Sequence, residues 1–188
     1  MYPVIRMAYE YIRCSYDPPL PLGGMHIMTT RCMPWDLDMW MELNNGRTLT
    51  LYDIGRLALA RRIGLVEALK RRRWGLTMAG ASVRFRKRVR MFNKFEVRSI
   101  SVGRDERFFY MEQSMWRNGE ATSSILYRIA VTDKNGIVPT QDVVTEVGGP
   151  DWNPHLPVWV EEWIKAESHR PWPPTAEAKP EELAQAGA

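Results

Sequence analysis

The sequence predicts an α+β domain in which an antiparallel β-sheet curls around one long helix. Three observations favour this class. One long helical pattern, over residues 47–63, precedes a run of strand patterns. Short turns join those strands, as in an antiparallel sheet. An antiparallel sheet commonly buries one face, and no other segment is long enough to cover it, so we expect this helix on that face.

The helical segment carries its apolar residues on one side. Those that recur at the spacing i, i+3, i+7 are Leu51, Ile54 and Ala58. We expect Asn45 to cap the start of the helix, because an Asn side chain accepts a hydrogen bond from an unpaired backbone N–H. Small residues, Gly55 among them, would let a neighbouring element approach the helix backbone closely. One or two further helical turns are expected over residues 65–73.

The strand patterns alternate with a period of two residues. They cover Thr77–Val89, Lys94–Val102, Arg107–Trp116 and Ser123–Thr132, with an earlier strand at His26–Met33. Asn118-Gly119 and Asn135-Gly136 are typical hairpin turns. The sequence therefore predicts strands joined by short hairpins, and so an antiparallel sheet, after the helix.

The rest of the chain is expected to form appendages to this domain. Residues 1–24 read as an N-terminal arm with a short helix, followed by residues 25–148 as the domain itself. Residues 149–170 read as a C-terminal helical extension, with its helix over 150–166. Residues 171–188 are rich in Pro, Ala and Glu and are expected to be a disordered tail.

Composition excludes several protein classes. Lys and Arg number 26 against 22 Asp and Glu, a net charge of +4 that permits a polyanionic partner without demanding one. No stretch is apolar enough for a membrane span or a secretory signal. Cys14 and Cys32 are expected to be reduced thiols of a cytoplasmic protein. The three histidines lie far apart, so no metal site is expected.

A motif before the long helix carries a family resemblance. Residues 36–47 read Asp-Leu-Asp-Met-Trp-Met-Glu-Leu-Asn-Asn-Gly-Arg, and residues 52–56 read Tyr-Asp-Ile-Gly-Arg. This pattern resembles the hotdog-fold acyl-CoA thioesterases of the 4-hydroxybenzoyl-CoA thioesterase-like family, including their thioesterase superfamily member six type. The resemblance covers about residues 25–145 and implies a hotdog fold.

The resemblance also implies an activity, the hydrolysis of an acyl-CoA or acyl-carrier thioester to free acid and thiol. Asp38 matches the family's active-site aspartate, which attacks the carbonyl carbon or activates water. Backbone N–H groups at Asn45 and Gly46 would hold the oxyanion at the helix start. No metal or redox cofactor is implied, since coenzyme A is part of the substrate. Family members assemble with sites between subunits, so a homodimer or higher homo-oligomer is expected.

Further residues are candidates for substrate binding. They are Asn44, Arg47 and Asp53, with Arg86, Lys87 and Arg88 for the phosphates of coenzyme A. Alternating arginines over residues 84–90 would project to one side of a strand. The competing interpretations are a solvated strand face for these cations and a surface pair with Arg56 for Asp53.

The motif also departs from the family. Met41 and Glu42 stand where the family has Gly-His, so a non-catalytic acyl-CoA or acyl-carrier binding protein is the main alternative function. Asp36 is the rival to Asp38 if the register slips, although an exposed loop acid is its more ordinary interpretation. A polyanion-binding module that binds RNA is less favoured, so no nucleic-acid partner is expected. A dehydratase would want a histidine, which the loop and long helix lack.

Overall fold

The structure is a computed structural model that describes residues 2–172 and 174. It divides into two compact units, residues 1–154 and 155–188. The first unit contains the sheet and nearly all helices, and the second contains the helix α5 (Val158–Ser168). Most of the predicted tail, 171–188, lies outside the described residues. Among the described residues, no helix has the length and apolarity needed to cross a membrane.

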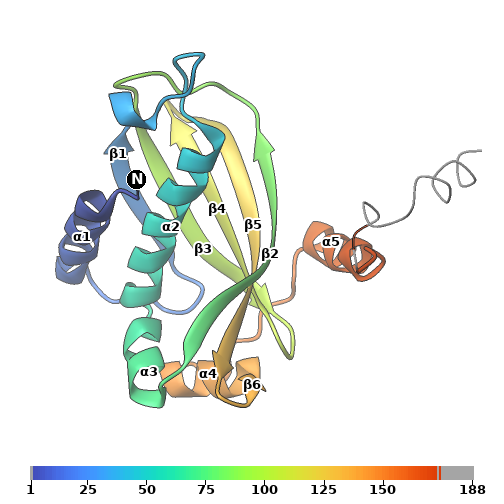
Figure 1. Ribbon diagram of the computed structural model, residues 1–188. Helices are drawn as coiled ribbons and strands as arrows, with labels where there is room; N and C mark the ends of the chain where they lie inside the picture. Colours follow the sequence, from blue (N-terminus) through green and yellow to red (C-terminus); the bar gives the residue numbers. More distant parts are fainter. Residues whose placement is uncertain (1, 173, 175–188) are drawn as a thin grey trace, which may run out of the picture. The chain divides into compact units, whose positions relative to one another are not determined.

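The first unit is built on one antiparallel sheet (Figure 1). Its strands are β1 (Met25–Arg31), β2 (Gly75–Phe85), β3 (Lys94–Arg104), β4 (Phe109–Arg117), β5 (Glu120–Asp133) and β6 (Gly136–Ile137). The order across the sheet is β1-β3-β4-β5-β2, and the short β6 pairs with β5. The predicted antiparallel sheet is therefore confirmed, with hairpins from β3 to β4 and from β4 to β5. Strand β2 pairs with β5 rather than with β3, which follows it in the chain, so β1 and β2 form the two edges.

The long helix α2 (Asn45–Arg62) lies against the sheet as predicted (Figure 1). The predicted apolar face, with Leu51 and Ile54, is buried in the main core. Gly55 allows close contact, since a Cβ there would lie 3.0 Å from Val97 Cγ1 and from Ser99 Oγ. The expected extra turns form α3 (Leu65–Arg72).

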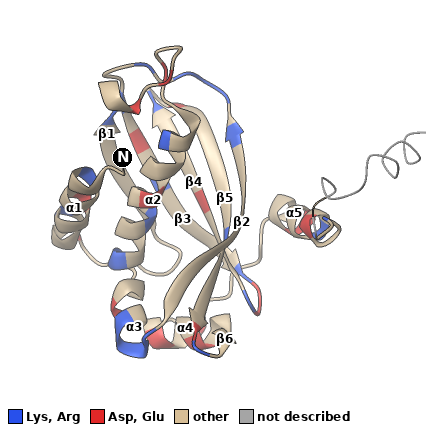
Figure 2. Ribbon diagram, in the orientation of Figure 1, with Lys and Arg blue, Asp and Glu red and all other residues tan. Residues whose placement is uncertain are grey.

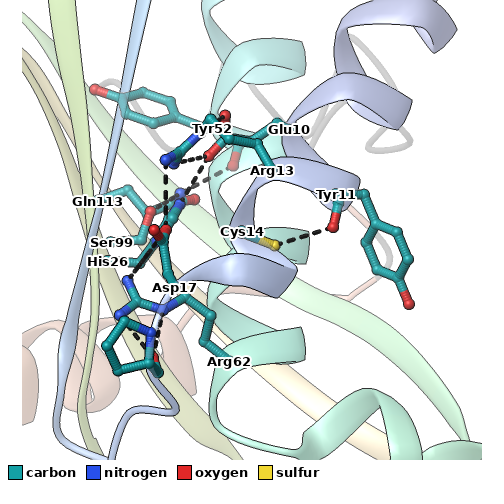
Figure 3. A network of polar contacts seen from close by, with 11 residues as sticks. Glu10, Tyr11, Arg13, Cys14, Asp17, His26, Tyr52, Arg62, Ser99 and Gln113 are labelled. Carbon is teal, nitrogen blue, oxygen red and sulfur yellow. Dashed lines mark hydrogen bonds and ion pairs between the residues drawn. The ribbon is translucent and has the colours of Figure 1, made fainter.

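An N-terminal helix, α1 (Val4–Arg13), packs beside α2 with its polar side inward (Figure 3). Its Glu10 is buried, and one carboxylate oxygen lies 3.2 Å from Nε2 of the buried His26. Arg62 of α2 approaches Nδ1 of His26 at 3.1 Å. A guanidinium can only donate, so Nδ1 accepts and Nε2–H donates to Glu10.

Two boundaries differ from the sequence prediction by several residues, and some short elements were not predicted. Strand β2 ends at Phe85 rather than at residue 89. The C-terminal helix begins at Val158 rather than at residue 150, because prolines at 154 and 157 delay its first turn. The helix α4 (Thr140–Val147) was not predicted, and a short η1 (Cys14–Tyr16) and η2 (Pro34–Asp36) flank β1.

Candidate functional site

The motif before α2 forms a closed loop. Asp38 N–H donates to the carbonyl of Glu42 at 2.8 Å, and Met41 N–H donates to the carbonyl of Asp38 at 3.1 Å. Leu37 and Leu43 pair as an isolated bridge across its base. Met41, where the family has glycine, has a φ of 60°. The chain therefore keeps a backbone conformation that favours glycine while carrying a large side chain there.

The carboxylate of Asp38 is half-buried and fastens this loop. Its Oδ1 accepts hydrogen bonds from the N–H groups of Trp40 at 2.9 Å and Glu42 at 3.2 Å. Its Oδ2 has no protein partner among the residues that the structure describes. The side chain is thus held in place through Oδ1, and Oδ2 is left without a hydrogen bond from these residues.

Asp36 has a different environment, and its interpretation as an exposed loop acid is wrong. It is fully buried, and its Oδ2 accepts from Nη2 of Arg6 at 3.0 Å and from the backbone N–H of Met33 at 2.9 Å. Its Oδ1 lies 3.3 Å from Nε of Arg47. Asp36 therefore joins α1, the loop and the first turn of α2, which is a structural role.

The start of α2 is capped one residue earlier than predicted. Asn44, not Asn45, is the N-cap, and its Oδ1 accepts from Arg47 N–H at 3.1 Å. The N–H groups of Asn45 and Gly46, the first two of the helix, have no protein acceptor in the described part of the chain. Both residues are exposed. These two N–H groups, at the positive end of the helix dipole, are the free donors of the site.

Most of the basic segment, residues 86–90, lies in a loop after β2, so the prediction that its arginines share one side of a strand is wrong. After Phe85, the N–H groups of both Arg86 and Lys87 donate to the carbonyl of Thr122, which ends the strand pairing. The ammonium of Lys87 lies 2.6 Å from Glu120, and the guanidinium of Arg88 lies 2.9 Å from Glu42.

Two cavities flank the first turn of α2. One, of about 210 Å³, is called the basic cavity below and lies between the helix start and the basic loop, residues 86–90. Its polar lining includes Glu42, Asn45, Thr48, Arg86, Lys87 and Arg88. The other, of about 420 Å³, includes Asp36, Asn44, Gly46 and Arg47. Asp38 lines neither cavity. The structure thus gathers most predicted site residues around one helix end but leaves Asp38 beside them, on the loop.

Asp53 lies apart from this group. It faces a groove of about 720 Å³ along α2, about 12 Å further along the helix axis than Asn45. Its Oδ1 accepts from Nη2 of Arg56 at 2.6 Å, so the expected pair is present. Burial raises the pKa of Asp53, and Arg56 limits the rise.

Sequence reasoning missed two buried contacts at the site. The hydroxyl groups of Tyr52 and Ser123 lie 2.8 Å apart, next to the cavity at the helix start, and burial raises the pKa of Tyr52. Arg6 reaches Asp36 from thirty residues away. No local spacing reveals either pair. In the described part of the chain, no cluster of three or more His, Cys, Asp or Glu side chains is placed to hold a metal ion.

The amino-acid sequence matches a known protein family. The model of a family described as the thioesterase-like superfamily matches residues 32–164. Protein THEM6 of Xenopus laevis is 36% identical over 110 residues, covering 58% of this chain and 53% of that protein. The chain spans about half the length of the curated relatives it matches.

Solved structures agree on the fold. A probable thioesterase from Bartonella henselae is 17% identical, with a TM-score of 0.55 over 62% of this chain and 97% of that one. A hypothetical protein from Staphylococcus aureus, solved in complex with CoA, is 8% identical, with a TM-score of 0.58 over 77% and 94%. The fold is thus a hotdog fold, and the chain belongs to the thioesterase-like superfamily.

Proposed function

We propose that the protein hydrolyses an acyl-CoA or acyl-carrier thioester to free acid and thiol, in the cytoplasm and without a metal or redox cofactor. The observation that carries this proposal is that one short segment, residues 38–46, holds both a fixed carboxylate and the free N–H groups of a helix start. Asp38 is fixed through Oδ1 with Oδ2 free, and Asn45 and Gly46 present unsatisfied N–H groups a few residues later. Thioester hydrolysis needs groups of these two kinds, a carboxylate and oxyanion donors.

In this reaction Asp38 acts on the thioester carbonyl. Its carboxylate either removes a proton from a water molecule that attacks the carbonyl carbon, or attacks that carbon itself and is then released by water. The negative charge that develops on the carbonyl oxygen is held by the N–H groups of Asn45 and Gly46. The C–S bond then breaks, and the thiolate leaves and takes up a proton.

The basic loop is assigned to the phosphates of coenzyme A. Arg86 is exposed and has no carboxylate within 4.0 Å in the described part of the chain, so it is available to an anion. Lys87 and Arg88 would exchange Glu120 and Glu42 for phosphate oxygens, which Lys binds as a point charge and Arg binds through two parallel hydrogen bonds. Asn44 and Arg47 support the helix start. A neighbour in the same fold, solved with CoA, supports this class of substrate.

A second copy of the chain is part of the proposal. Strand β2 is an edge strand, exposed along most of its length, with large apolar side chains at Leu76, Met78, Val83 and Phe85. Such an edge invites pairing with another strand. We propose a homodimer or higher homo-oligomer in which Asp38 and Asp53 meet residues of the partner, because neither shares the basic cavity within one copy.

The test is a thiol-release assay with a panel of short, long and aromatic acyl-CoAs. Asp38→Asn should lower kcat/KM roughly a hundredfold or more, the scale of a lost general base. Asp142→Asn is the control, since it removes an exposed carboxylate on α4, outside the candidate site, and should retain the activity of wild type. Loss of activity in Asp53→Asn, with Asp38→Asn unaffected, would move the catalytic role to Asp53.

Non-catalytic binding is the second candidate, and one contact favours it. Glu42, at the family's histidine position, pairs with Arg88, so the loop holds an anion next to the predicted phosphate site. The absence of turnover with every acyl-CoA, together with a rise in melting temperature on adding it, would identify a binding protein. A polyanion-binding module would instead bind RNA with an affinity that falls steeply with salt.

A further inference from the structure

Two loops at the end of the domain where α2 begins expose large apolar side chains. Those side chains, called the apolar tip below, are Trp35, Met39, Trp40, Met41, Met91 and Phe92. Met39 is 82% exposed and Trp40 is 73% exposed. Isolated apolar residues are common on surfaces, but a group of this size marks a contact surface.

The backbone that presents the apolar tip is firmly held. Leu43 N–H donates to the carbonyl of Val89 at 2.8 Å, and Phe92 N–H donates to the carbonyl of Cys32 at 2.7 Å, so the two loops are joined. Met41 and Phe92 have φ values of 60° and 62°. Large side chains persist in this conformation only where their surroundings fix it. The outward position of the tip is therefore built into both loops.

Cations without carboxylate partners lie on the same loops and the adjoining strands. This basic cluster consists of Arg31, Arg86, Arg90 and Lys94, all exposed, and none has a carboxylate within 4.0 Å among the described residues. Arg31 donates to the carbonyl of Phe92 at 3.1 Å and is paired with Lys94 across the sheet. Figure 2 shows Lys and Arg residues in the loops and strand ends at this end of the sheet.

We propose that this end of the domain docks on a membrane surface that carries anionic lipid. Trp side chains favour the boundary between headgroups and hydrocarbon, and Met side chains adapt to irregular apolar surroundings. Basic residues close to an anionic leaflet each strengthen binding. The apolar tip enters the boundary layer, while the basic cluster contacts lipid phosphates that lie further out.

Docking would also orient the candidate site. The basic cavity is lined by Glu42, Arg88 and Val89, which belong to the same two loops. Its opening would then lie at the level of the headgroups, where an acyl thioester with a long chain concentrates. This consequence rests on the proposed function, whereas the docking itself does not.

The experiment is co-sedimentation of the purified full chain with vesicles of equal parts phosphatidylglycerol and phosphatidylcholine, and with pure phosphatidylcholine. We expect binding to the anionic vesicles only, weakened by added salt. Met39→Ser with Trp40→Ser should lower the partition coefficient roughly tenfold or more. Arg90→Gln with Lys94→Gln should lower it roughly tenfold. Quenching of tryptophan fluorescence by brominated lipid should decrease in the first variant.

The matched control is Lys70→Gln with Arg73→Gln, which removes the same charge at α3. That helix follows the far end of α2, which is about 27 Å long and well beyond the screening length of about 8–10 Å. Binding should stay within about twofold of wild type. The proposal is overturned by the absence of vesicle binding, by binding to both vesicle types alike, or by equal loss in the control.

Two further results would assign the surface to another partner. If the Met39→Ser, Trp40→Ser variant changes the mass measured by light scattering and leaves vesicle binding intact, the apolar tip is a contact between copies of the chain. If the protein binds heparin but no vesicles, the basic cluster serves a soluble polyanion. Either result contradicts membrane docking, and thiol release by the same variants tests the proposed function separately.

Discussion

Helix α1 turns mainly charged side chains toward the domain, with Met7 as an apolar contact to the core, whereas α2 turns apolar ones. In α1, Arg6 and Glu10 point inward to Asp36 and His26, while Ile5 is 88% exposed. In α2, the inward face is made of Leu51, Ile54 and their apolar neighbours. A helix can thus be held on a domain by a few directional polar contacts or by the burial of apolar surface area. Different substitutions should weaken the two kinds of attachment.

The largest expected effect separates the apolar faces of the two helices. Leu51→Ala in α2 should lower the free energy of unfolding by about 2–5 kcal/mol, because it leaves a cavity in the core. Ile5→Ala in α1 should change it by about 0.5 kcal/mol or less, because that side chain is exposed. Urea unfolding of both variants measures the difference. An equal loss would mean that the outer face of α1 is covered in solution.

The next effect concerns the polar attachment of α1. Glu10→Gln should lower the free energy of unfolding by about 1.5–3 kcal/mol, because it replaces a buried charge-assisted bond to His26 and Arg13. A double-mutant cycle with His26→Asn isolates the pair. A coupling energy near zero would show that the contact between Glu10 and His26 does not stabilise the packing of α1 on the domain.

A pH effect should distinguish the two attachments further. Burial acts to raise the pKa of Glu10, but hydrogen bonds from His26 and Arg13 outweigh it, so the pKa is lower than usual. A carboxylate with a lowered pKa stabilises the fold above the pKa of the unfolded chain, and this stability is lost as the pH falls through the folded value.

Wild type should therefore lose stability more steeply than Glu10→Gln below about pH 5, by up to about 1.4 kcal/mol per pH unit for one proton. Urea unfolding between pH 3 and 6 measures both slopes, and Leu51→Ala, which removes no titrating group, should follow wild type. Parallel curves for wild type and Glu10→Gln would remove Glu10 from the acid response.

The same contrast explains what could be read from the sequence. The spacing of Leu51 and Ile54 predicted α2 and its buried face, because apolar periodicity and burial agree there. The periodicity of α1 predicted a helix but did not reveal that its polar side faces inward. The inward partners, His26 for Glu10 and Asp36 for Arg6, come from β1 and η2, outside the helix.

The candidate site divides in a similar way. The motif predicted which loop and helix end would meet, since those residues are adjacent in sequence. It misplaced the cap by one residue and left Asp36 on the surface, because a buried acid and an exposed one look alike without their partners. The basic segment was extended into a strand, because alternation continued past the point where Thr122 ends the pairing.

The smallest expected effect tests whether packing or helix propensity dominates in each helix. Gly55→Ala adds about 1 kcal/mol of propensity, but its Cβ would lie 3.0 Å from both Val97 and Ser99, and such overpacking costs about 1–3 kcal/mol. We expect a net loss of about 1 kcal/mol. Ala8→Gly, on the exposed side of α1, should lose a similar amount through propensity alone. If thermal unfolding shows that Gly55→Ala is stabilising, the side chains of Val97 and Ser99 can shift to make room for the methyl group, and close packing does not explain the glycine.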